Sequence, residues 1–147
     1  PIIKSLQVQK LQEKGKKISP GFFSSIINDR PYIVLKYAQS LNKKVGVADT
    51  NFWISNPYTK RLTHKWRSEI NAIIVGTRTL TVDNPQLNNR LYFGKSPVKL
   101  LLKRDGIIPS DAAALLTEGK TIVVSDASPV ILDVNIGIQY FIVSSGI

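Results

Sequence analysis

Short apolar runs, each long enough for one β-strand, constrain the fold of this chain more than any other feature. Helical patterns and turn residues separate these runs. The runs cover residues 72–75, 98–102, 121–124 and 139–143. Apolar runs of this length bounded by turn residues are typical of strands, and strands that alternate with helices indicate an α/β domain. We therefore expect an α/β fold with a mostly parallel central sheet and helices on both faces.

The segment before these runs predicts two further strands. Residues 32–38 form an apolar run rich in β-branched side chains, which favours a strand. Lys36 interrupts this run, so it either faces solvent or belongs to a site; we expect its stem to lie along apolar surface with the amine in water. A turn is expected at 41–44, followed by a short strand at 45–48.

Three helices are expected between the strands. Ser55 is a good N-cap, and Asn56-Pro57 favours a helix start directly after it. Apolar residues recur every four positions along this helix and predict a stripe that packs on the core. The stripe consists of Tyr58, Leu62, Trp66 and Ile70. Shorter helices are expected at 77–82, closed by Asn84-Pro85, and at 110–117, capped by Ser110.

Composition limits the classes of function. The 147 residues are 43% hydrophobic, which suffices for one domain or part of one. Neither an apolar stretch of about 20 residues nor a signal-peptide pattern occurs, so we expect no membrane partner and a cytoplasmic location. The chain has no cysteine, which excludes disulfides and thiolate metal sites. Its net charge of +10 attracts phosphorylated metabolites, cofactors or nucleic acid, although the dispersed cations also fit a solvated basic surface.

The turn after residue 75 is the strongest candidate for a ligand site. An apolar strand runs into Gly76, which lets a ligand approach the backbone closely. A helix start follows, and its free N–H groups suit a phosphate or pyrophosphate. The next polar loop holds Asp83, a hydrogen-bond acceptor for a ribose or amide, and Arg90, which can pair with a phosphate. A plain strand–turn–helix and an ordinary loop are the alternatives.

Other conspicuous residues are less informative. Trp53 fits either core packing or the wall of a pocket for a flat ring. Arg67 is either a phosphate ligand or a surface arginine. His64, the only histidine, is expected to be solvated, and without a second histidine or a cysteine we expect no metal site.

Four segments together resemble a known family. They read RPYIVLKYAQSL at 30–41, FWIS at 52–55, Arg67 on the following helix, and AIIVGTRTLTVDNPQLNNR at 72–90. Their order and spacing are similar to the C-terminal reductase domain of the bifunctional riboflavin-biosynthesis deaminase/reductase. The resemblance implies a dihydrofolate-reductase-like fold. It also implies that NADPH reduces the ribosyl group of 5-amino-6-(5-phosphoribosylamino)uracil to the ribityl form.

The resemblance also implies roles for individual residues. The cofactor would contact Ala38, Trp53, Thr79 and Asp83, with Gly76 added because of its turn. The substrate would contact Asn51, Arg67, Leu87 and Arg90, with the two arginines near its phosphate. Lys103-Arg104 stands where the family has Asp-Ser, and we expect the extra cation of Arg104 to favour the 2′-phosphate of NADPH. We name no proton donor; Lys36 is a candidate only because of its unusual position.

The resemblance suggests how the chain is organised. We expect residues 1–21 to be a linker from a preceding zinc deaminase domain and residues 22–147 to be the reductase domain. The Glu-Gly-Gly turn of the family does not occur, so its C-terminal part is expected to be missing and the fragment could lack activity by itself. A homodimer is expected.

Three alternatives remain open. A reductase of the same fold could act on a pteridine-like molecule. A basic nucleic-acid-binding module would use the +10 charge, although no nucleic-acid motif occurs and we expect no such partner. A fragment without catalytic activity could assemble with a partner subunit.

Overall fold

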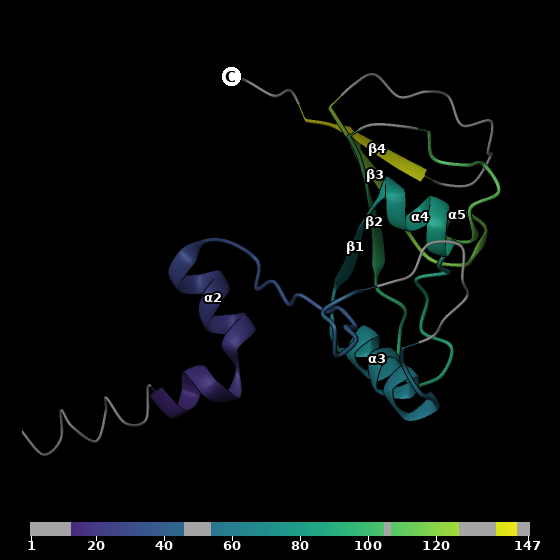
Figure 1. Ribbon diagram of the computed structural model, residues 1–147. Helices are drawn as coiled ribbons and strands as arrows, with labels where there is room; N and C mark the ends of the chain where they lie inside the picture. Colours follow the sequence, from purple (N-terminus) through teal and green to yellow (C-terminus); the bar gives the residue numbers. More distant parts are fainter. Residues whose placement is uncertain (1–12, 46–53, 105–106, 127–137, 144–147) are drawn as a thin grey trace, which may run out of the picture. The chain divides into compact units, whose positions relative to one another are not determined.

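The chain consists of two compact units, Pro1–Phe52 and Trp53–Ile147. The computed structural model describes residues 13–45, 54–104, 107–126 and 138–143 (Figure 1). None of the helices in these ranges combines the length and the apolar character that a membrane span requires.

The first unit contains helix α2 (Pro20–Asn28) and an extended segment that follows it. The strand predicted at 32–38 is wrong for the described chain: these residues are assigned to no strand, and Ile33 and Leu35 are largely exposed. Sequence shows only the propensity for a strand, whereas a strand also needs a hydrogen-bonded neighbour. The predicted turn at 41–44 is confirmed, because the Lys43 N–H donates to the Ser40 carbonyl (2.9 Å) and Lys43 has a φ of 62°.

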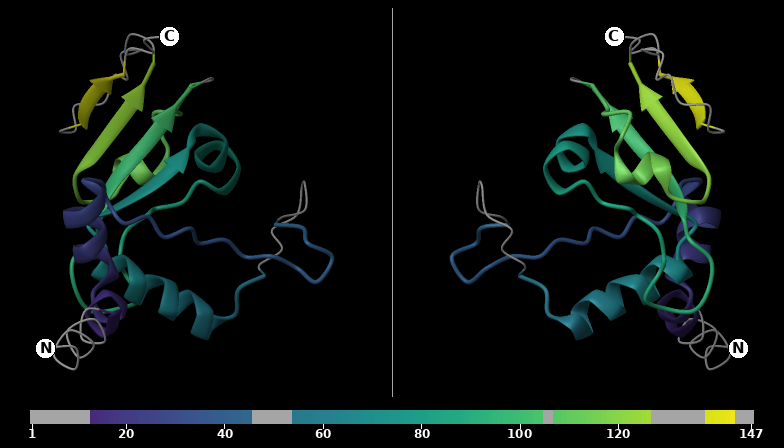
Figure 2. Two further views of the ribbon diagram at one scale, coloured as in Figure 1. Left: turned by 90° about the vertical axis from the view of Figure 1, so that its left-hand side faces the viewer. Right: turned by 90° about the vertical axis from the view of Figure 1, so that its right-hand side faces the viewer.

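A four-stranded parallel sheet organises the second unit. Its order is β1 (Ala72–Gly76), β2 (Val98–Lys103), β3 (Thr121–Ser125) and β4 (Ile138–Ile142). Figure 2 shows the arrows side by side and pointing the same way. The four apolar runs are therefore confirmed as strands, whereas most of the strand predicted at 45–48 lies outside the described residues.

The described residues of this unit include three helices, and two of them start differently from the prediction. Helix α3 (Pro57–Glu69) is capped by Asn56, whose Oδ1 accepts the Thr59 N–H at 2.9 Å, and not by Ser55. Helix α4 (Thr77–Asp83) ends, as expected, at Asn84, which adopts a left-handed conformation. Helix α5 (Ala113–Leu116) is shorter than predicted and has no cap from Ser110.

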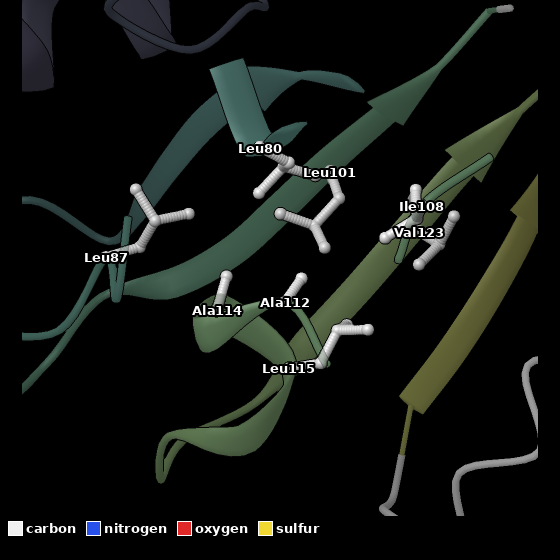
Figure 3. Close-up of a cluster of buried hydrophobic side chains, with 8 residues drawn as sticks. All are labelled: Leu80, Leu87, Leu101, Ile108, Ala112, Ala114, Leu115 and Val123. Carbon is white, nitrogen blue, oxygen red and sulfur yellow. The ribbon is translucent and has the colours of Figure 1, made fainter. Parts of the chain in front are cut away.

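The core lies on one face of the sheet, beneath α4 and α5 (Figure 3). Leu101 of β2 and Val123 of β3 are register partners and therefore share a face. The buried apolar residues are Leu80, Leu87, Leu101, Ile108, Ala112, Ala114, Leu115 and Val123. Burial of each leucine or valine stabilises the fold by about 1.5–3 kcal/mol. The core includes Leu87, so packing fixes the loop between α4 and β2.

Candidate active site

The loop between α4 and β2 (residues 84–97, the α4–β2 loop) is held in place by bonds to α5 and the residue after it. Asn84 Oδ1 accepts the Ala113 N–H at 2.7 Å, which caps the first turn of α5 from outside the helix. The Thr117 hydroxyl donates to the Gln86 carbonyl at 3.0 Å. Leu87 is only 3% exposed and has a φ of 58°. A buried leucine in the left-handed region costs conformational energy, which these contacts must offset.

Arg67 and Arg90 meet at Asn88 of this loop. Arg67 Nη1 donates to the Asn88 carbonyl at 2.8 Å, and Arg90 Nη1 donates to the Asn88 side-chain oxygen at 3.0 Å. The predicted pair of arginines is therefore brought together by one asparagine. Arg67 is half-buried on α3, whereas Arg90 is exposed.

The two guanidinium groups form a locally cationic site. Burial and then the charge of Arg90 lower the pKa of Arg67. Within the described residues, Arg67 Nε is buried and has no hydrogen-bond partner. A buried donor without a partner is costly, and a bound anion would satisfy it and reduce the repulsion between the arginines. The arrangement suits a phosphate group.

His64 contradicts the expectation of a solvated histidine. It is 4% exposed, and its Nδ1 accepts the Arg90 backbone N–H at 3.1 Å. The prediction that the apolar stripe of this helix packs on the core is also wrong. Tyr58 of that stripe is largely exposed, and the buried residue of α3 is His64. The backbone of the α4–β2 loop offers a hydrogen-bond donor to this helix, so a polar residue packs there.

Lys99 is a second buried polar residue that the sequence reasoning missed. It is 1% exposed, and its Nζ donates to the carbonyls of Ala114 (2.7 Å) and Thr117 (2.8 Å) and to the Thr117 hydroxyl (3.1 Å). The same hydroxyl holds Gln86, so Lys99 is linked to the α4–β2 loop through one residue. Burial lowers the pKa of Lys99.

Signals for these missed residues exist in the sequence. Lys99 interrupts an otherwise apolar strand, as Lys36 interrupts residues 32–38, but Lys36 is exposed. His64 precedes Arg67 by three positions, so both can lie on one side of a helix. Neither pattern identifies the loop atoms that these side chains contact.

Three of the predicted cofactor residues, Gly76, Thr79 and Arg104, lie at or shortly after the carboxyl ends of β1 and β2. The Thr77 hydroxyl donates to the Leu102 carbonyl at 3.1 Å and ties these two ends together. A Cβ at Gly76 would meet nothing within 4 Å, so the space at this strand end is open. Ligands of open parallel sheets bind at such ends. Thr79 is half-buried on the helix that begins here.

The remaining predicted site residues are less well defined. Asp83 is exposed at the end of α4, and Arg104 is exposed just after β2. Asn51 and Trp53 lie outside the described residues, and Ala38 belongs to the first unit. The roles of all predicted site residues stay predictions. Within the described ranges, no group of three or more His, Cys, Asp or Glu residues is arranged to hold a metal ion.

Comparison with curated proteins identifies several relatives. The chain is 33% identical over 117 residues to the riboflavin biosynthesis protein RibD of Aquifex aeolicus, covering 78% of this chain and 33% of that protein. It is 39% identical over 61 residues to a 2,5-diamino-6-ribosylamino-4(3H)-pyrimidinone 5′-phosphate reductase of Kluyveromyces marxianus, covering 41% of this chain and 24% of that protein. The chain thus spans about a third or less of the length of these relatives.

Solved structures agree with the sequence comparison. A diaminohydroxyphosphoribosylaminopyrimidine deaminase/5-amino-6-(5-phosphoribosylamino)uracil reductase of Thermotoga maritima superposes with a TM-score of 0.76 at 26% identity, covering 92% of this chain and 38% of that one. RibD of Acinetobacter baumannii gives a TM-score of 0.74 at 25% identity, covering 87% and 37%. The expected dihydrofolate-reductase-like α/β fold is confirmed. Because residues 31–132 match the RibD C-terminal domain, the chain belongs to that family.

Proposed function

We propose that the chain is the reductase part of a riboflavin-biosynthesis enzyme. It reduces the ribosyl group of 5-amino-6-(5-phosphoribosylamino)uracil to the ribityl form. The observation that carries this proposal is the pair of guanidinium groups, Arg67 and Arg90, that meet at Asn88. The relatives from Thermotoga and Kluyveromyces support it, because both are named as reductases of phosphorylated ribosylaminopyrimidine compounds.

Arg67 and Arg90 would hold the substrate phosphate, with Leu87 and Asn51 as further contacts. A phosphate fixed at one end of the molecule orients the ring-opened sugar at the other end, which is the main requirement for hydride transfer. Arg67 Nε is buried and has no hydrogen-bond partner in the described structure. Its N–H would therefore be available to donate to the phosphate.

Membership of a reductase family suggests a nicotinamide cofactor, and we propose NADPH. The open strand end at Gly76 is compatible with a ligand close to the backbone. The expected contacts are Ala38, Trp53, Gly76, Thr79, Asp83 and Arg104, with Arg104 near the 2′-phosphate. When bound, NADPH supplies the hydride, and the protein supplies orientation and charge.

The wider context is also part of the proposal. The part of this chain that matches covers only 33% of the Aquifex protein and 38% of the Thermotoga protein, which supports fusion to an N-terminal zinc deaminase domain through residues 1–21. We further propose a homodimer in the cytoplasm, with 22–147 as the reductase part.

Matched substitutions in the natural protein that carries this sequence test the phosphate site. We expect Arg67→Gln and Arg90→Gln to raise KM for the phosphorylated substrate by about 10- to 100-fold, because each removes hydrogen bonds to a charged group. Arg61→Gln, on the same helix but exposed, is the control and should leave KM within about twofold. KM is measured from NADPH oxidation.

The substrate without its phosphate provides the contrast. Neither arginine variant should change the rate with this compound relative to the unaltered protein. An equal loss with both compounds would contradict a phosphate role. Full activity of both variants with the phosphorylated substrate would likewise contradict the phosphate role, whereas an unaltered protein that does not reduce this substrate would favour a reductase of a pteridine-like molecule.

A further inference from the structure

His64 is buried beside the two arginines but does not belong to the predicted substrate-binding residues. It is 4% exposed, and its Nδ1 accepts the Arg90 backbone N–H at 3.1 Å. This bond joins α3 to a loop residue 26 positions later in the chain. It therefore fixes the backbone position from which the Arg90 side chain reaches Asn88.

The bond requires a neutral imidazole. A neutral histidine has one ring nitrogen with a free lone pair, whereas both ring nitrogens of a protonated histidine are donors. A protonated Nδ1 would present an N–H to the N–H of Arg90, and the two would repel. The bond to Arg90 thus exists only in the uncharged state.

The surroundings of His64 favour this uncharged state. The charged groups that face it are Arg67 on its own helix and Arg90 on the α4–β2 loop, and Asn89 of that loop is the neutral polar neighbour. Burial, then Arg67 and Arg90, lower the pKa of His64, while the nearby Asn89 side chain opposes them. Both facing charges are positive, so protonation adds a third cation to the cluster.

We propose that His64 is a positioning residue, which holds Arg90 at the phosphate site through the Arg90 backbone and does so only while its imidazole is neutral. This inference rests on the proposed function, because it assumes that Arg90 binds the substrate phosphate. It adds a residue that never touches the substrate and yet controls how tightly the phosphate is bound.

Two variants of similar size separate positioning from packing. In His64→Asn the new side-chain oxygen can lie near the position of Nδ1, whereas His64→Leu fills similar space without an acceptor. We expect His64→Leu to raise KM for the phosphorylated substrate about tenfold with kcat unchanged, since one hydrogen bond is lost. His64→Asn should keep KM within about threefold of the unaltered protein. Equal KM values for the two variants would overturn the proposal.

A pH profile tests the proposal even if His64→Leu fails to fold. The substrate phosphate titrates identically in all samples, so the ratio of KM between the unaltered protein and His64→Asn isolates the histidine. We expect this ratio to rise on acidification, because only the unaltered protein loses its acceptor. A ratio that stays constant or falls would contradict the inference.

Arg90→Gln distinguishes failure of this inference from failure of the proposed function. If Arg90→Gln weakens binding of the phosphorylated substrate while His64→Leu does not, positioning by His64 is wrong and the phosphate site stands. If neither variant changes KM, Arg90 binds no phosphate, and the positioning role of His64 falls together with the proposed role of Arg90.

Discussion

Replacement of Lys99 by methionine is the most direct test of how the fold supports the candidate site. Methionine has nearly the same length, so the change removes the charge and the donors but little volume. Three short bonds to a charged donor would contribute about 1.5–3 kcal/mol each, but burial of an ammonium group costs several kcal/mol. The substitution removes both the favourable bonds and the unfavourable burial of the charge. The summed hydrogen-bond energies therefore overestimate the loss of stability.

The net loss of stability comes from the oxygen atoms that no longer accept a hydrogen bond from residue 99. Ala114 is fully buried, and its carbonyl, which accepts from Lys99 at 2.7 Å, would lose that bond. The two oxygens of Thr117 belong to a half-buried residue that water can reach. An unsatisfied buried acceptor costs about 1–3 kcal/mol, so we expect Lys99→Met to lower the free energy of unfolding by about that amount.

Urea unfolding followed by circular dichroism measures this loss, with Lys120→Met as the control. Lys120 is exposed one residue before β3, and its substitution should change stability by less than about 0.5 kcal/mol. A loss for Lys99→Met no larger than that of the control would refute the reasoning, and so would a gain in stability. Either result would mean that desolvation of the ammonium cancels its bonds.

Two further predictions concern α3. Asn56→Ala should lower the free energy of unfolding by about 1 kcal/mol, because the Thr59 N–H loses its cap; an unchanged thermal midpoint would show that this cap contributes nothing. The pKa of His64 is lowered from 6.5 on folding, so the unfolded chain takes up a proton first as the pH falls through 6.5. Stability should therefore decrease on acidification from that pH down to the folded-state pKa. Urea unfolding at several pH values should find no such decrease in His64→Asn, and an identical decrease there would contradict the assignment.

The strands were predictable because their signal is local. Residues 98–102 and 121–124 are apolar apart from Lys99 and Thr121. They form β2 and β3, which each have a parallel neighbour on both sides, and strands of parallel sheets typically consist of such near-continuous apolar runs. Residues 32–38 carry the same signal but are assigned to no strand in the described structure. Composition indicates that a segment can form a strand, whereas the partner that completes the strand is a property of the whole fold.

The candidate site was predictable only in part. Its arginines, Arg67 and Arg90, were expected from the family resemblance, but their meeting at Asn88 depends on the path of a loop. The basic residues on either side of His64 in the sequence favour a solvated side chain. Its burial follows from the Arg90 N–H that it accepts, a contact between segments that no local pattern records.

The α4–β2 loop explains why these buried polar residues matter for function. Two adjacent arginines repel each other, and a loop free to move would separate them in the absence of an anion. Instead, bonds from His64, Thr117 and Ala113 reach Arg90, Gln86 and Asn84. The free energy of folding therefore holds the two charges in place before any ligand arrives. A phosphate then binds without having to order the loop, which reduces the entropic cost of binding. We therefore expect substitutions of the buried polar residues to change KM. Substitutions of the exposed basic residues of α3 should have little effect on KM.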